Sequence, residues 1–178
     1  MSDQYPIEKI RSDFPILGQT NRGKPLAYLD NAASSQKPQR VIDSISKFYE
    51  STNSNVHRGV YQLAEEAENR YRMAREYIAD WFSVTADELI FTRGTTESLN
   101  LVANSFGKTQ LGEGDRVIVS EMEHHANIVP WQLVCKTVGA QITVVPVLSD
   151  GSLDRQALSS LLKDPASRIL SLCQVSNT

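Results

Sequence analysis

Two of the chain's three histidines lie side by side, within Glu-Met-Glu-His-His-Ala-Asn at residues 121–127. Such a pair could bind a metal, transfer protons, support a flat ligand or form a polar turn. Successive side chains of an extended segment point to opposite faces, which argues against one ligand shared by His124 and His125. A zinc site of three histidines would also need His57, and neither an H-E-x-x-H nor a C-x-x-C spacing supports it. We therefore expect no metal site.

Of the two histidines, His124 follows a predicted strand most directly, so we favour it as the functional residue. For His125, a role as a hydrogen-bonding partner of the following helix start is just as plausible. Asn127 is the expected N-cap of that helix, and Pro130 fits its first turn, where a missing N–H has no cost.

A second candidate site is the turn Gly94-Thr95-Thr96, which joins a predicted strand to a predicted helix. The first turn of a helix has unpaired N–H groups and a partial positive charge of about half an electron. Two hydroxyls add donors, and glycine lets an anion approach the backbone. An ordinary threonine N-cap, completed by Glu97 or Ser98, would explain the same residues. Together with His124 on the same rim, the turn suggests a phosphorylated aromatic ligand.

The elements that would position these residues alternate between short apolar runs and helical patterns, as in a parallel sheet with crossover helices. The expected strands are residues 26–30, 88–94, 115–120, 142–147 and 168–176. The expected helices are residues 38–51, 60–82, 95–108, 128–139 and 153–162, with Gly139 as a left-handed C-cap. The sequence therefore predicts an α/β fold with a mostly parallel sheet and helices on both faces. Residues 1–25 are expected to form a separate N-terminal segment before a domain that starts at residue 26.

Composition restricts the classes of function. The 178 residues are 40% hydrophobic and 22% charged with a net charge of −3, so no basic excess favours nucleic-acid binding. No apolar run approaches the roughly 18 residues of a membrane span, and the N-terminus lacks the apolar core of a secretory signal. The two cysteines, Cys135 and Cys173, lie in apolar segments, which suits a reducing compartment. We expect a cytoplasmic protein that binds neither nucleic acid nor membranes.

Five segments, taken together and in order, resemble the cysteine desulfurases of the SUF iron–sulfur assembly type. These segments are YLDNAASSQKP (28–38), NVHRG (55–59), FTRGTTESLNLVANS (91–105), MEHHANIVPW (122–131) and QVSNT (174–178). The desulfurases belong to the class V aminotransferase-like enzymes, which have the fold type I architecture and depend on pyridoxal 5'-phosphate. The resemblance implies that residues 26–178 are the N-terminal part of the large, cofactor-binding domain.

The resemblance also implies roles for individual residues. Thr95 and Thr96 match the turn that holds the cofactor phosphate. His124 matches a histidine that stacks on the pyridine ring and moves protons, as a near-neutral imidazole can. Asn177 matches an asparagine near the phenolic oxygen of the cofactor.

Four further residues match the surroundings of the substrate. A small-residue turn at the substrate pocket corresponds to Ala32 and Ala33. A loop that lies close to the active site across a homodimer corresponds to His57 and Arg58.

The implied reaction converts L-cysteine to L-alanine and leaves the sulfur as a persulfide for an acceptor protein of iron–sulfur assembly. In the family, the Schiff-base lysine, the pyridinium aspartate, the substrate arginine and the persulfide cysteine all follow the segment that matches residues 176–178. We therefore expect the chain to be catalytically incomplete alone, and Cys135 and Cys173 to be unreactive. The alternatives are another class V enzyme, such as an aminotransferase, an epimerase or a selenocysteine lyase, and a non-catalytic fragment that binds a partner.

Overall fold

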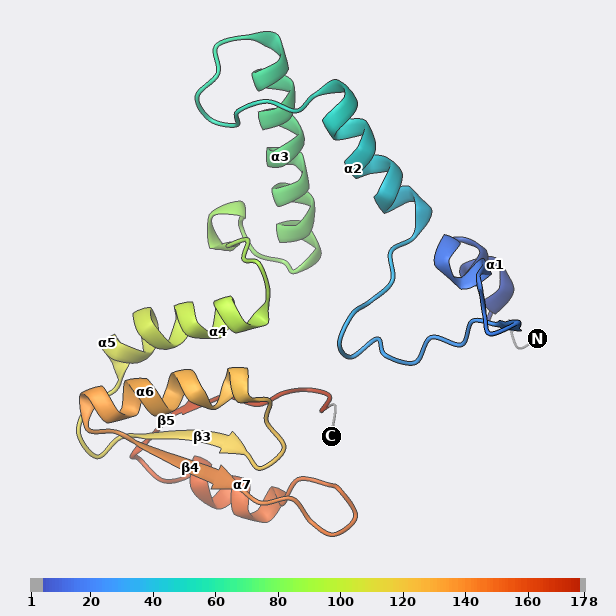
Figure 1. The fold of residues 1–178 in the computed structure, drawn as a ribbon. Coiled ribbons are helices and arrows are strands. Elements are labelled where there is room, and N and C mark those ends of the chain that lie inside the picture. The colour runs from blue at the N-terminus through green and yellow to red at the C-terminus, as the bar shows by residue number, and fades with distance from the viewer. Residues whose placement is uncertain (1–4, 177–178) are drawn as a thin grey trace. The chain divides into compact units, whose positions relative to one another are not determined.

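A computed structural model describes residues 5–176 of the chain. The fold divides between Ile90 and Phe91 into two compact units, each with its own internal contacts. Figure 1 gives the path of the chain and the labels of its elements. The boundary expected at residue 26 separates an N-terminal segment from a domain. The division at Ile90 is one of compactness and does not test that boundary, which stays a prediction.

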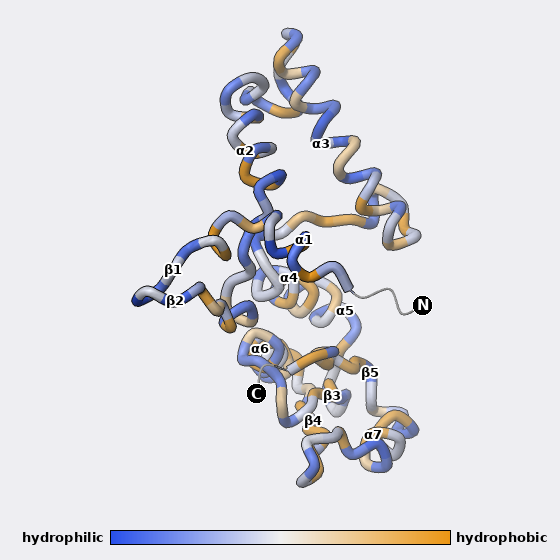
Figure 2. Tube along the Cα trace, turned by 90° about the vertical axis from the view of Figure 1, so that its right-hand side faces the viewer, coloured by the Kyte–Doolittle hydropathy of each residue, from blue (hydrophilic) through white to orange (hydrophobic). Residues whose placement is uncertain are grey.

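The first unit consists of helices and one short hairpin. Its elements are α1 (Ile7–Ser12), β1 (Thr20–Asn21), β2 (Lys24–Pro25), α2 (Gln39–Ser51) and α3 (Gln62–Trp81). The sequence predicts α2 and α3 to within two residues at their first and last positions, but neither α1 nor the antiparallel hairpin of β1 and β2. Apolar residues recur along α2 with the spacing of one helix face, and polar residues occupy the positions between them (Figure 2).

Three alanines give α3 its buried stripe, namely Ala64, Ala67 and Ala79. Arg75 of α3 binds the loop that follows the helix. Its guanidinium donates to the carbonyl oxygen of Ala86 at 3.2 Å and also to the carbonyl oxygen of Leu89. The same side chain bonds the Tyr71 hydroxyl at 2.8 Å. These contacts hold the end of the first unit against its longest helix.

The second unit contains a three-stranded parallel sheet. Its elements are α4 (Thr95–Val102), a π-helical turn (Ala103–Gly107), α5 (Lys108–Gln110), β3 (Arg116–Ser120), a 3₁₀ turn (His125–Asn127), α6 (Val129–Val138), β4 (Gln141–Val145), α7 (Arg155–Leu162) and β5 (Ser167–Leu170). The strand order is β4-β3-β5, so β3 is central and both crossovers return parallel. Figure 1 shows α6 on one side of the sheet and α7 on the other, which confirms the predicted fold class.

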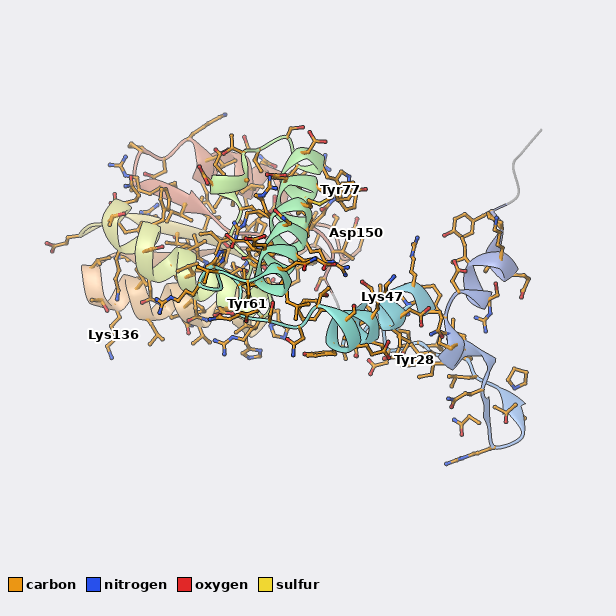
Figure 3. All side chains as sticks on the ribbon, turned by 90° about the horizontal axis from the view of Figure 1, so that it is seen from above. Tyr28, Lys47, Tyr61, Tyr77, Lys136 and Asp150 are labelled. Carbon is orange, nitrogen blue, oxygen red and sulfur yellow. The ribbon has the colours of Figure 1, made fainter. Side chains whose placement is uncertain are left out.

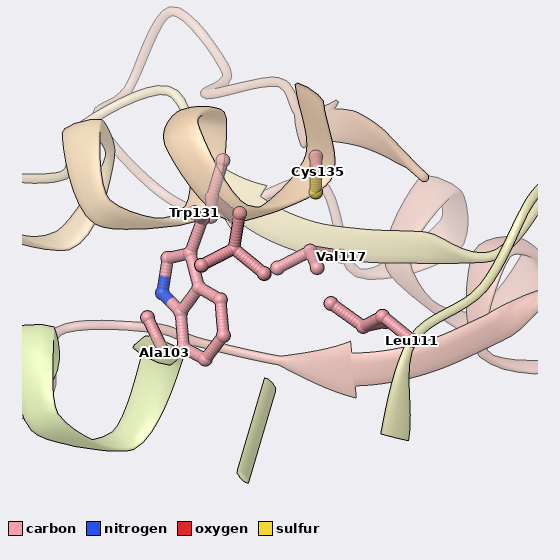
Figure 4. Close-up of a cluster of buried hydrophobic side chains, with 7 residues drawn as sticks. Ala103, Leu111, Val117, Trp131 and Cys135 are labelled. Carbon is pink, nitrogen blue, oxygen red and sulfur yellow. The ribbon is translucent and has the colours of Figure 1, made fainter. Parts of the chain in front are cut away.

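The core of the second unit lies between the sheet and α6. Residues Val117 and Val119 point from β3 toward Trp131 on α6, whereas Ile118 is buried on the opposite face. Figure 4 shows this cluster, whose buried members are Ala103, Leu111, Val117, Val119, Trp131, Val134 and Cys135. A side chain at Gly107 would lie 2.9 Å from the Trp131 ring, so the π-helical turn approaches α6 closely only because it has glycine there.

Two expected strands are absent from the described residues. Glu88 ends a 3₁₀ turn (Ala86–Glu88), and the segments 26–30 and 89–94 have irregular or bent backbone without a paired strand, with Leu29 92% exposed. Apolar side chains favour a strand only where a partner strand can pair with it, and neither segment pairs with another among the described residues. The expected strand at 168–176 is also shorter, because regular pairing ends at Leu170.

The ends of two helices follow the sequence closely. Gly139 closes α6 in the left-handed conformation, at φ 77°, as predicted. Asp154 caps α7 by accepting from the N–H groups of Gln156 and Ala157, at 3.0 and 2.8 Å. The prediction that Asn127 caps α6 was wrong, since α6 begins two residues later and the Asn127 amide bonds other side chains.

Candidate active site

The turn at the start of α4 leaves its donors free for a ligand. Gly94 is the N-cap residue and contributes no side-chain cap, and Thr95 and Thr96 are the first two residues of the helix. Both threonines are exposed, and no hydrogen bond joins their hydroxyls to any other described residue. A Cβ placed on Gly94 would meet no atom within 4 Å, so the space beside this residue is open. This geometry suits an anion.

The alternative of a threonine cap or a capping box does not hold here. Ser98 does approach the turn, with its hydroxyl 2.7 Å from that of Thr92. The Glu97 carboxylate turns back to Arg93, accepting from its backbone N–H at 2.7 Å and from its guanidinium at 3.1 and 3.2 Å. These bonds lower the pKa of Glu97, so this carboxylate is engaged with a cation rather than with the N–H groups of the first turn.

His124 presents one ring nitrogen to the protein and the other to its surroundings. The Ala126 N–H donates to His124 Nδ1 at 3.0 Å, which makes His124 the side-chain cap of the 3₁₀ turn. The neutral ring must then carry its proton on Nε2, because Nδ1 is already an acceptor. The side chain is exposed, so this Nε2–H is available to a ligand.

The two adjacent histidines are neighbours whose rings contact each other. The rings of His124 and His125 are edge to face, with centroids 6.2 Å apart and an interplanar angle of 89°. Among residues 5–176, no group of three histidine, cysteine, aspartate or glutamate residues could hold a metal ion.

The anion turn and the imidazole lie in the same region of the second unit. Helix α4, which begins with Thr95 and Thr96, contacts the 3₁₀ turn His125–Asn127 that follows His124. The structure therefore places helix α4 next to the turn that follows His124, beyond the carboxyl end of β3, where ligands bind in open α/β sheets.

Glu123 is a member of this region that the sequence analysis missed. It is only 8% exposed, yet its carboxylate accepts from the Ser120 hydroxyl at 2.6 Å, from the Asn127 amide at 2.7 Å and from the Cys173 N–H at 2.9 and 3.0 Å. Burial alone would raise the pKa of Glu123, but these hydrogen bonds outweigh it and lower the pKa. No local signal marks it, because its neighbours Glu121, His124 and His125 are exposed polar residues.

The cysteines and lysines of this unit are poor candidates for covalent chemistry. Burial raises the pKa of the Cys135 thiol, and burial together with the neighbouring Glu123 carboxylate raises that of Cys173. Thiols with a raised pKa are weak nucleophiles at neutral pH. Lys136 extends from the exposed side of α6 (Figure 3). The expectation that neither cysteine is reactive agrees with these surroundings.

The remaining predicted site residues lie in the first unit or outside the described residues. Ala32 and Ala33 occupy an exposed turn in which Asp30 accepts from the Ala33 N–H at 3.2 Å. His57 has a positive φ of 75° and packs edge-on against Tyr71, while Arg58 is exposed. Asn177 lies outside the described residues. The substrate-pocket roles of these four residues and the cofactor role of Asn177 stay predictions.

A parallel sheet with a phosphate-type turn and a histidine at its carboxyl end defines a class of α/β proteins that bind phosphorylated ligands. Within that class, the model of the family "Aminotransferase class-V" matches residues 27–178, and the chain belongs to this family. No described helix is both long and apolar enough to cross a membrane.

The chain is similar to several cysteine desulfurases. It is 48% identical to a cysteine desulfurase of Enterobacter sp. (strain 638) over 174 residues, which are 97% of this chain and 43% of that protein. Among solved structures, cysteine desulfurase CsdA from Escherichia coli is 37% identical with a TM-score of 0.81, over 99% of this chain and 43% of that one. The apo cysteine desulfurase of Thermococcus onnurineus NA1 is 30% identical with a TM-score of 0.86, over 100% and 42%. The chain thus spans less than half the length of these relatives.

Proposed function

We propose that the complete protein containing this chain is a cysteine desulfurase that depends on pyridoxal 5'-phosphate and converts L-cysteine to L-alanine. The single observation that carries this function is the contact between α4 and the turn that follows His124. It combines an anion-binding helix start with an exposed imidazole whose Nε2–H is free. The names of the similar proteins support the choice of reaction within the family.

The residues present fit the cofactor. Its phosphate would bind the N–H groups and the Thr95 and Thr96 hydroxyls at the start of α4, since these donors have no other partner in the described residues. His124 would face the pyridine ring, because its Nδ1 is fixed by the turn and its other edge is exposed. Bound pyridoxal phosphate supplies the electron sink of the reaction.

His124 would move a proton at its Nε2 atom while its Nδ1 stays bonded to the Ala126 N–H. A positioned imidazole can both accept and donate a proton, which suits transfer in both directions. Asn177 would lie near the phenolic oxygen of the cofactor. Ala32, Ala33, His57 and Arg58 would border the substrate, the last two from the second copy in a homodimer.

The biological setting belongs to the same proposal. We expect a cytoplasmic homodimer of the SUF type that passes its persulfide sulfur to an acceptor protein for iron–sulfur cluster assembly. The Schiff-base lysine, the pyridinium aspartate, the substrate arginine and the persulfide cysteine would come from sequence that follows residue 178. The raised pKa values of Cys135 and Cys173 support this, because neither thiol suits the role of sulfur acceptor.

The complete protein is expected to form L-alanine from L-cysteine in the presence of pyridoxal phosphate and a thiol reductant, with sulfide or persulfide in equal amount. Amino-acid analysis and a sulfide assay measure both products. The chain of residues 1–178, if it can be isolated, is the control and is expected to form none. Transamination or epimerisation without sulfur release by the complete protein would favour another class V activity, and a complete protein without the visible absorbance of the cofactor would favour a non-catalytic role.

Replacing Thr96 by valine is expected to weaken pyridoxal phosphate binding about tenfold or more, because a hydrogen bond to a charged group contributes about 1.5–3 kcal/mol. The fold is expected to stay intact, since the hydroxyl bonds no described residue. Cofactor titration followed by visible absorbance measures the affinity, and Thr95→Val is expected to act in the same direction.

Thr137→Val is the matched control for this substitution. Its hydroxyl donates only to the Leu133 carbonyl, at 2.9 Å on an exposed part of α6, so cofactor affinity is expected to be unchanged. Unchanged affinity in both Thr95→Val and Thr96→Val would contradict the assignment of the phosphate to this turn.

A further inference from the structure

The buried carboxylate of Glu123 connects three parts of the second unit. Its donors come from the end of β3 (Ser120), from the 3₁₀ turn (Asn127) and from the segment after β5 (Cys173). The Cys173 N–H is 50 residues away in sequence and reaches both carboxylate oxygens, at 2.9 and 3.0 Å. A buried carboxylate is costly unless such donors satisfy it, so the network is specific for an acceptor at this position.

Asn127 extends the network to the core. Its Nδ2 donates to Glu123, and its Oδ1 accepts from the Trp131 indole at 3.1 Å and from the Ser171 hydroxyl. The amide is therefore oriented from three sides, with every one of these contacts made by side chains of the second unit. This orientation places the amide nitrogen of Asn127, rather than its oxygen, toward the Glu123 carboxylate.

Along the chain, His124 lies between Glu123 and Asn127, the two central residues of this network. It directly follows Glu123, its carbonyl accepts from the Asn127 N–H at 2.7 Å, and its ring accepts from the Ala126 N–H. A shift of Glu123 or Asn127 would therefore move the backbone that carries the imidazole. The contacts of the exposed ring are with the same turn, namely the Ala126 N–H and the edge of the His125 ring.

We propose that Glu123 is a positioning residue for His124: its carboxylate fixes the turn that presents the imidazole and ties the segment after β5 to the same turn. This inference rests on the proposed function and assigns it a further residue. Glu123 touches neither the cofactor nor the substrate in this role. It acts through the conformation of residues 124–127 and of the segment that leads to residue 176, where Ser176 also bonds the Met122 carbonyl at 3.0 Å.

The test is a double-mutant cycle in the complete protein with Glu123→Gln and His124→Ala. The glutamine has a similar shape, but its NH₂ group presents a donor where the carboxylate accepts, so one contact of the network is lost. Glu123→Gln is expected to lower the turnover number for alanine formation at least tenfold, with little change in cofactor affinity. Added to His124→Ala, it is expected to cause little further loss, because residues that act as one unit are not additive.

Glu121→Gln is the matched control, since Glu121 is exposed and accepts only from the Val147 N–H, at 3.0 Å, which a glutamine carbonyl can also do. It is expected to leave turnover unchanged. Hydrogen exchange measured on peptides spanning residues 121–129 provides a readout that does not depend on activity. Exchange there is expected to be faster in Glu123→Gln than in the wild type and the control.

If the losses of turnover caused by the two substitutions multiply in the double variant, the inference is overturned. Unchanged hydrogen exchange in Glu123→Gln would overturn it as well. If Glu123→Gln does not fold, Ser120→Ala replaces it, because it removes one donor and is expected to give a smaller loss that is again absent in the His124→Ala background. A wild-type protein that forms no alanine overturns the proposed function and this inference with it. An active wild type with an additive cycle overturns this inference alone.

Discussion

Replacing His124 by alanine is expected to slow alanine formation by the complete protein by about 10²–10⁴-fold, the usual contribution of a positioned general acid–base group. Binding of pyridoxal phosphate is expected to weaken much less, because its phosphate would be held by α4 and its covalent anchor would lie elsewhere. The reason is local: the imidazole has its Nδ1 occupied by the Ala126 N–H and only its Nε2 available to exchange a proton. Steady-state kinetics together with cofactor titration separate the two effects.

Two further variants divide the structural role of His124 from its chemical role. Asparagine at this position can still accept from the Ala126 N–H as an N-cap, but it has no group that titrates near neutral pH. We therefore expect His124→Asn to lose as much turnover as His124→Ala while keeping the turn intact. His125→Ala is the neighbouring control and is expected to retain turnover, since the side chain that caps the 3₁₀ turn is that of His124 and not that of His125. A loss of turnover confined to His125→Ala would reverse the assignment of the two histidines.

Much of this site could be predicted from sequence because it depends on local signals. The Gly-Thr-Thr turn and the histidine pair each follow an apolar run, and parallel strands bring their carboxyl ends to one edge of the sheet. The structure confirms that α4 and the histidine turn are neighbours. It also confirms the fold class, since strand β3 is buried on both faces between α6 and α7.

The parts that sequence did not predict depend on partners far along the chain. Glu123 has the sequence context of an exposed acid, and the distant Cys173 N–H joins the nearby Ser120 hydroxyl and Asn127 amide to make it a buried acceptor. Asn127 was wrongly assigned as a helix cap partly because its amide also bonds Ser171, 44 residues along the chain. The strands expected at 26–30 and 88–94 are absent for a related reason. Apolar composition is a local property of the sequence, whereas strand pairing depends on a partner elsewhere in the chain.

Replacing Trp131 by alanine is expected to lower the free energy of unfolding by about 3–5 kcal/mol, as is typical for a large buried aromatic side chain. Trp131 is 2% exposed and packs from α6 against the sheet and the π-helical turn, where a Cβ on Gly107 would lie 2.9 Å from its ring. Urea denaturation of the complete protein followed by far-UV circular dichroism measures the loss.

Two further variants separate the contribution of Trp131 to the core from its contribution to the site. Trp81→Ala removes an equally large ring that is 77% exposed, and it is expected to change stability by far less. Trp131→Phe keeps most of the buried area but loses the indole N–H that bonds Asn127, a change expected to cost about 1 kcal/mol beyond the altered packing. Because Asn127 orients Glu123 and Glu123 precedes His124, this variant is also expected to reduce turnover. A phenylalanine variant with reduced stability but full turnover would show that the core supports the fold without positioning His124.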